Sequence, residues 1–215
     1  MKLAIREPIN ALTHFIGFVL SFIGFWALLY KSITAGNAFY IISSVVFSAG
    51  LMGLYLSSSI YHGKISTDRI IQRLRKLDHA MIFFLIAATY TPVCLISLQG
   101  TLGYIMLASI WTLAIAGMFL KAFVAHVPRW ISTGLYLFLG WVSVSVIKPL
   151  YASMEPAGVY LLIAGGLFYT IGAIIYGTKS ERMRIGSFGH HEIFHLLILL
   201  GSTSHYFMVL FYVLT

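Results

Sequence analysis

Long apolar runs dominate the pattern of hydrophobic and polar positions along the chain. Seven stretches have about 20 residues each, the length that an α-helix needs to cross a bilayer. They cover residues 12 to 30, 38 to 61, 78 to 98, 102 to 120, 130 to 148, 157 to 177 and 191 to 213. The runs are apolar on every face, whereas barrel strands alternate apolar and polar residues. The pattern therefore predicts an all-α integral membrane protein, a seven-transmembrane-helix bundle that forms a single domain over residues 1–215.

Composition supports a membrane environment. Hydrophobic residues make up 60% of the chain, charged residues only 9%, and the mean hydropathy is +0.92. A soluble domain carries about a quarter charged residues, so this chain is not expected to be one. The basic start followed by an apolar run resembles a secretory signal, but Glu7, Pro8 and Asn10 interrupt it and six more spans follow. We expect the first span to be retained as a helix.

Basic residues predict the orientation of the bundle. Only Lys31 and Lys148 fall on one side of the predicted membrane. The other side carries Lys2, Arg6, Lys64, Arg69, Arg73, Arg75, Lys76, Lys121, Arg129, Lys179, Arg182 and Arg184. Because basic loops stay inside, we expect a cytoplasmic amino terminus and a carboxyl terminus outside. The net charge of +8 is explained by these short loops and by anionic membrane lipids, so we expect no nucleic-acid partner.

Three histidines at matching depth are the best clue to function. His191 and His195 are four residues apart, which places both imidazoles on one helix face about 6 Å apart along the axis. His62 ends the second predicted helix at the same side of the membrane. Titratable groups are rare in membrane helices without a partner, so the three rings suggest a shared metal ion. Cys94, the only cysteine, cannot build a thiolate site alone, which leaves nitrogen and oxygen ligands.

Two oxygen-bearing residues are expected beside these histidines. Ser58 lies one turn before His62 on the same helix face, and Asp78 begins the third predicted helix on the same side of the membrane. Three imidazoles would leave the fourth position of a tetrahedral zinc open, as in catalytic sites. An aspartate could then orient or deprotonate a water, and a serine could stabilise an oxyanion.

Five short motifs resemble those of one known family. They are EPINALTH at residues 7 to 14, SSIYH at 58 to 62, LDH at 77 to 79, TYTP at 89 to 92 and GHHEIFH at 189 to 195. Together they resemble the haemolysin III family, which is related to the progestin and adiponectin receptors and more distantly to alkaline ceramidases. The resemblance covers the whole chain, which looks like the compact bacterial form of the family and so suggests a bacterial inner membrane location.

The resemblance implies specific roles for the predicted site residues. It implies zinc near the cytoplasmic face held by His62, His191 and His195, with Asp78 beside the metal water and Ser58 nearby. Since the site would lie in the inner leaflet, the leading hypothesis is zinc-dependent hydrolysis of an amide or ester bond in a lipid-like substrate.

Other functions and other polar residues remain as alternatives. The zinc could be purely structural, in a non-enzymatic receptor-like or membrane-homeostasis protein. A pore-forming cytolysin is less expected, because the chain has neither a soluble form nor a charged amphipathic segment.

Glu7 and His14 are interpreted as a helix cap and an interhelical hydrogen bond rather than as metal ligands. His205 lies about 21 Å beyond His191 along the helix, so it is expected to hydrogen-bond to a neighbouring helix. Glu192 could support the metal ligands or serve as a helix-start carboxylate.

Overall fold

A computed structural model describes residues 5–124, 127–178, 184, 186 and 188–215. The part of the chain that it describes is all-helical, with no strand. Its α-helices are α1 (Pro8–Thr34), α2 (Ala38–Gly63), α3 (Asp68–Pro92), α4 (Gly100–Phe123), α5 (Arg129–Trp141), α6 (Ile147–Ser153), α7 (Pro156–Thr178) and α8 (His190–Met208). Two π-helical segments, η1 (Val93–Leu98) and η3 (Val209–Val213), and one 3₁₀ segment, η2 (Val142–Val146), continue three of these helices.

Within the described residues, seven helical spans are long and apolar enough to cross a membrane, which confirms the predicted number. Six of them are a single α-helix with at most a short terminal extension, whereas the fifth runs from Arg129 to Ser153 through α5, η2 and α6. The third span begins at Asp68, ten residues before the predicted start at Asp78. The added turns are rich in charged residues, so a search for apolar runs does not detect them although they are helical.

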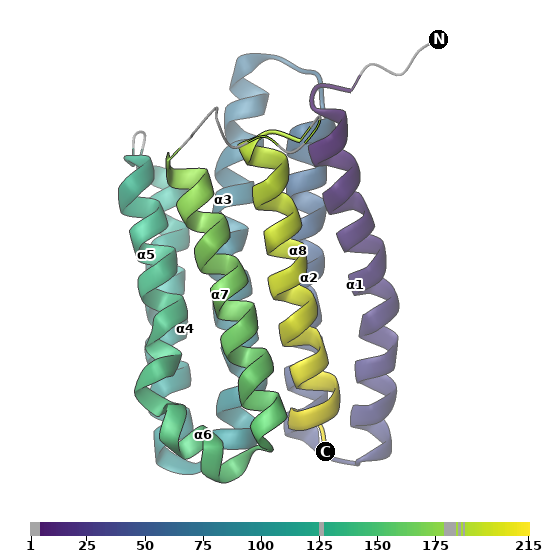
Figure 1. Cartoon of the computed structure of the whole chain (residues 1–215), viewed down its shortest axis with the longest axis vertical. Helices are drawn as coiled ribbons and strands as arrows, with labels where there is room; N and C mark the ends of the chain where they lie inside the picture. Colours follow the sequence, from purple (N-terminus) through teal and green to yellow (C-terminus); the bar gives the residue numbers. More distant parts are fainter. Residues whose placement is uncertain (1–4, 125–126, 179–183, 185, 187) are drawn as a thin grey trace.

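The helices form a closed ring in which neighbours in sequence are mostly neighbours in space. α1 packs on α2, α2 on α3, α3 on α4 and α7 on α8, while α8 also contacts α1 and closes the ring. The third span is the most buried of the seven. Figure 1 shows the amino terminus and the start of α8 at one end of the bundle and the carboxyl terminus at the other. The end of α2 and the start of α8 therefore share one end, as the histidine pattern requires.

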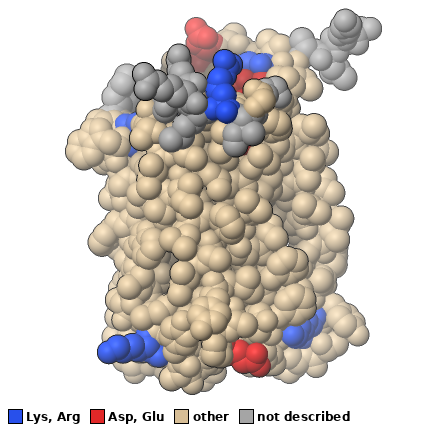
Figure 2. All heavy atoms as spheres, viewed as in Figure 1, with Lys and Arg blue, Asp and Glu red and all other residues tan. Residues whose placement is uncertain are grey.

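On the face that Figure 2 shows, charged side chains gather at the two ends of the molecule. In Figure 2, lysine, arginine and acidic side chains gather at the top and bottom of the view, with an uncharged band between them. Large apolar side chains such as Trp26, Ile105 and Phe207 are exposed on the outside of the helices. An outward apolar band with charged rims is the surface that a bilayer requires. The protein is therefore a multi-pass membrane protein. Lys2, Lys179 and Arg182, used in the orientation prediction, lie outside the described residues.

A side chain of α3 forms hydrogen bonds with the backbone groups that are freed where the fifth span breaks. The single proton of the Tyr90 hydroxyl is shared between the backbone oxygens of Leu139 (2.8 Å) and Gly140 (2.9 Å), and the N–H of Ser143 donates to the same hydroxyl at 2.7 Å. In lipid, backbone groups freed by a helix break need such partners. Two residues later, Pro92 ends α3 and η1 continues the span.

Gly50 allows α2 and α3 to pack closely. A β-carbon there would lie 2.6 Å from the β-carbon of Ala88, so only glycine lets α2 and α3 approach this closely. Gly166, by contrast, has open space around its α-carbon and lines a cavity instead.

Candidate metal centre

Two helix ends bring three imidazoles together. His62 lies in the last turn of α2, and His191 and His195 lie on the first turns of α8, so their rings project into the same space. The ring centroids are 5.0 Å apart for His62 and His191, 4.8 Å for His62 and His195, and 4.7 Å for the pair on α8. One ring nitrogen from each histidine lies within 4.8 Å of the other two. The three residues are thus positioned to hold one metal ion.

The nitrogen spacing fits a metal site. Nε2 of His62 and Nε2 of His191 are 3.3 Å apart. Two nitrogens that bind one tetrahedral zinc at about 2.0–2.1 Å are separated by roughly 3.3 Å. Three imidazoles suit zinc and other transition metals, whereas calcium and magnesium prefer oxygen ligands. Cys94 lies in η1 and is fully buried, as expected for a cysteine with a packing role.

The predicted oxygen-bearing residues border the same space. Ser58 and Asp78 line the cavity that His62, His191 and His195 also line. Both are buried, with 1% of Ser58 and 9% of Asp78 exposed. Asp78 lies ten residues inside α3, because the extra turns of that helix project beyond the cluster. The structure therefore places all five predicted residues around one cavity.

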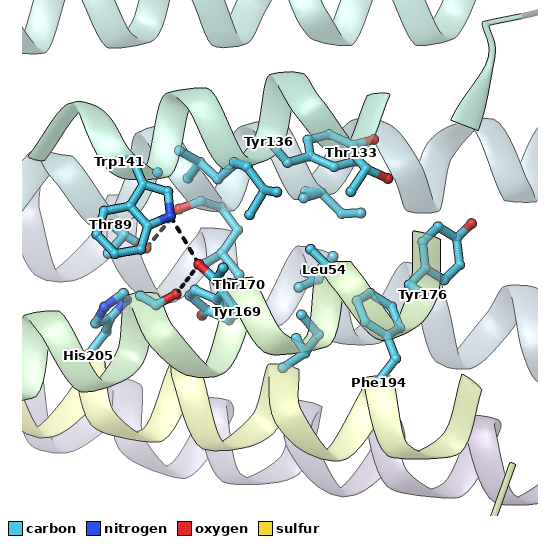
Figure 3. Close-up of a pocket in the computed structure, with 18 of the residues that line it drawn as sticks. Leu54, Thr89, Thr133, Tyr136, Trp141, Tyr169, Thr170, Tyr176, Phe194 and His205 are labelled. Carbon is cyan, nitrogen blue, oxygen red and sulfur yellow. Dashed lines mark hydrogen bonds between the residues drawn. The ribbon is translucent and has the colours of Figure 1, made fainter. Parts of the chain in front are cut away.

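The cavity extends from the histidine cluster into the bundle. Its volume is about 450 Å³, and most of its wall consists of apolar side chains from α3, α5, α7 and α8. In Figure 3, Tyr176 and Phe194 lie at one end, beside His191, and Trp141 and His205 lie at the other. An elongated apolar cavity with a polar end suits the tail and head of an amphiphile.

Glu7 contacts the cluster from outside. Its carboxylate makes no capping bond to α1, so the prediction of a helix cap is wrong. Instead, Nδ1 of His62 lies 2.5 Å from Oε2 of Glu7, so Glu7 is hydrogen-bonded to the end of α2. That hydrogen bond is the main reason why the pKa of Glu7 falls to about 2, with the nearby Arg6 adding to the effect. The carboxylate is therefore ionised at neutral pH.

The remaining buried histidines do not belong to the cluster of three. Among the described residues, neither ring nitrogen of His14 has a hydrogen-bond partner, so the bond predicted for it is wrong. Its ring instead stacks on His195, with centroids 3.7 Å apart and planes 10° apart. Nε2 of His205 lies 3.1 Å from the backbone oxygen of Leu162 on α7, which confirms the predicted bond to a neighbouring helix.

Asn10 and Thr13 contact the site but were not singled out from the sequence. Asn10 donates to Glu7 and to Glu192, and Thr13 lies 3.5 Å from Nδ1 of His195. Their spacing contains a usable signal, because residues 7, 10 and 13 repeat every three positions and so share one helix face. What that face contacts could not be predicted from the spacing.

Comparison with known proteins identifies the family. Residues 3–206 match the family model described as haemolysin-III related. The chain belongs to the haemolysin III family. It is 40% identical to the hemolysin-3 homolog of Bacillus subtilis, over 97% of this chain and 95% of that protein. Identity to hemolysin-3 of Bacillus cereus is also 40%, over 97% and 92% of the two chains. The human monocyte to macrophage differentiation factor is 27% identical over 93% of this chain and 81% of its own length.

Family membership confirms the resemblance seen in the motifs. All five motifs fall within residues 3–206, the part that matches the haemolysin III family model. This haemolysin III protein thus combines seven membrane-spanning helices with three histidines positioned to hold a metal.

Proposed function

We propose that the protein is a zinc-dependent hydrolase that cleaves an amide or ester bond in a lipid-like substrate. The site would face the cytoplasmic leaflet of a bacterial inner membrane, with membrane lipids as its surroundings and source of substrate. One observation carries the proposal: three imidazoles, a carboxyl group and a hydroxyl group border one cavity whose remaining wall is largely apolar.

The polar end of the cavity contains the groups that hydrolysis needs. Zinc held by His62, His191 and His195 would supply Lewis-acid polarisation and make water acidic enough to react near neutral pH. Asp78 would accept a proton from the attacking water and return it to the leaving amine or alcohol. The Ser58 hydroxyl would donate a hydrogen bond to the oxygen that becomes negative as the carbonyl is attacked.

The apolar part of the cavity would bind the chain of the substrate. Leu54, Ile82 and Phe194 are among the side chains that line it near the cluster. Burial of an acyl chain against such residues is favourable by about 0.8 kcal/mol for each methylene group. It would also fix the reacting carbonyl near Asp78, which raises the rate by orienting the reactants.

Asp78→Asn tests the proposal directly. The amide keeps the size of the side chain but cannot accept the proton, so turnover should fall about 100- to 10,000-fold. The assay uses detergent-purified protein loaded with zinc and a panel of long-chain amides and esters. Asp68→Asn is the matched control, because Asp68 is an exposed aspartate at the start of the same helix and should keep full activity. Folded wild type that binds zinc but cleaves no member of the panel would overturn the proposal.

A structural metal in a non-enzymatic receptor-like protein is the second candidate. One observation favours it: α2 and α8 pack mainly against other helices, so a metal held by His62, His191 and His195 would tie together two helices with few other contacts. Structural zinc can supply much of the stability of a fold. Wild type without turnover, whose thermal stability falls strongly on chelation, would favour this candidate over hydrolysis.

A further inference from the structure

The first turns of α1 lie against the histidine cluster although they contribute none of its three members. Glu7, Asn10 and Thr13 are spaced three residues apart and therefore share one side of the helix start. Asn10 has a polar side chain but is only 3% exposed. Hydrolysis as proposed above uses none of the three side chains, so their partly buried contacts require a separate explanation.

Glu7 determines which nitrogen of His62 is free. The oxygens of Glu7 already accept from Asn10 at 3.3 Å and pair with Arg6 at 3.2 Å. This carboxyl group is therefore an acceptor, and Nδ1 of His62, 2.5 Å away, is the donor that fits it. In a neutral ring this leaves the lone pair on Nε2. That is the nitrogen that lies 3.3 Å from Nε2 of His191, inside the cluster. The contact with Glu7 therefore presents the correct atom of His62 to a metal.

Asn10 connects this carboxylate to the helix that carries the other two histidines. Its amide nitrogen donates to Oε2 of Glu7 at 3.3 Å and to Oε1 of Glu192 at 3.0 Å. The second oxygen of Glu192 accepts the backbone N–H of Gly189 at 2.9 Å, at the start of α8. A continuous series of hydrogen bonds thus runs from the end of α2 through α1 to the start of α8.

The next turn of α1 restrains His195 in the same way. The Thr13 hydroxyl donates to the backbone oxygen of Asn10 at 3.1 Å, so its lone pairs are available to Nδ1 of His195, 3.5 Å away. A proton on Nδ1 would again leave Nε2 as the free nitrogen. The ring of His14 stacks on that of His195 at 3.7 Å and 10°, which restricts the plane of the ring.

We propose that Glu7, Asn10 and Thr13 are positioning residues that preorganise two imidazoles of the metal centre, so that metal affinity depends on a helix that supplies no metal ligand. Carboxylate, hydroxyl and amide groups behind metal-bound histidines raise affinity by fixing the tautomer and the orientation of each ring. The proposal rests on metal binding at the three histidines and is independent of hydrolysis.

Metal affinity of the purified full-length protein tests the proposal. Cobalt(II) or zinc is titrated into metal-free protein against a chelator of known affinity. Glu7→Ala should weaken binding about 10- to 100-fold, as is typical when a group behind a metal ligand is removed. Glu7→Gln keeps an acceptor for Nδ1 and should lose less. Glu155→Ala is the matched control, because Glu155 is exposed at the far end of the bundle and should leave affinity unchanged.

A double-mutant cycle separates positioning from general stability. If Glu7 acts through His62, adding Glu7→Ala to His62→Ala should cost no further affinity. The visible absorption spectrum of cobalt(II) at saturation should also differ between Glu7→Ala and wild type, which a loss of stability alone would not cause. Unchanged affinity and spectrum in both Glu7 variants would overturn the proposal. So would equal losses from Glu7→Ala in the wild-type and His62→Ala backgrounds.

These measurements need no turnover, so they separate this proposal from the hydrolase. If the wild type shows no turnover but Glu7→Ala still weakens metal binding, the positioning role is supported and hydrolysis is not. Full activity with unchanged affinity in Glu7→Ala would do the reverse.

Discussion

At the scale of single residues, the chemistry of the site depends on where the free nitrogens of three imidazoles point. Histidine offers either of two ring nitrogens to a metal, and the hydrogen bond made by the other nitrogen decides which. In His62 that bond is made by Glu7, and in His195 the Thr13 hydroxyl is the available partner. Composition and spacing identify the histidines, but these contacts between distant residues give them a usable geometry.

Removal of one histidine should weaken metal binding strongly. In His191→Ala, only two imidazoles remain, and the loss of affinity should exceed the roughly 10- to 100-fold effect of changes behind a ligand. His190→Ala is the control, since its ring is not among the three that converge. Metal analysis of both detergent-purified variants beside wild type is the measurement. Equal metal content in His191→Ala and wild type would refute the assignment of the site.

At the scale of secondary-structure elements, breaks in helices are tolerated only where another element satisfies the backbone. The fifth span changes from α5 to η2 at Val142, and Tyr90 from α3 bonds three backbone groups at that point. The apolar run from 130 to 148 predicts a helix but contains no signal of this break. The break and its partner are set by packing between α3 and α5.

Tyr90→Phe should destabilise the bundle without affecting metal binding. The phenyl ring keeps the packing, but the N–H of Ser143 and the carbonyl of Leu139 lose this partner, whereas the carbonyl of Gly140 keeps the Ser143 hydroxyl. Each buried group left unsatisfied costs about 1–3 kcal/mol. Thermal or denaturant unfolding in detergent measures the loss. Tyr30→Phe serves as the control, because 73% of Tyr30 is exposed and its loss should be neutral. A Tyr90 variant as stable as the control would show that the freed groups find other partners.

At the scale of the whole molecule, an odd number of spans separates the two chain ends. Figure 1 shows the amino and carboxyl termini at opposite ends of the bundle, consistent with seven spans. The three histidines that could hold a metal lie at the end where α1 and α8 start and α2 finishes. Which leaflet contains the site therefore depends on the orientation of the entire bundle.

The basic loops predict that orientation. We expect the amino terminus, and with it the metal centre, on the cytoplasmic side. Alkaline phosphatase fused to the carboxyl terminus, which is active only outside the cytoplasm, should be active in bacterial cells. A fusion in the loop between α2 and α3, which carries Lys64, should be inactive. The opposite pattern would place the site in the outer leaflet.

The sequence by itself determined the helical class, the number of spans and which three histidines are the candidate metal ligands. It could do so because membrane helices must be uniformly apolar over a fixed length, which makes them visible as runs, and because titratable residues within such runs stand out. A spacing of four residues on a continuous helix also fixes the relative direction of His191 and His195 without any tertiary information.

Only the tertiary structure decided what surrounds those histidines. Local spacing does not show which helices are neighbours, so it could not show that Glu7 reaches His62 or that His14 stacks on His195. The sequence also did not predict the ten additional residues of α3 or the break after Trp141. Charge sets the start of α3 and packing sets the break, so neither is visible in the hydropathy. The cavity is likewise a product of how α3, α5, α7 and α8 pack, since no single helix encloses space.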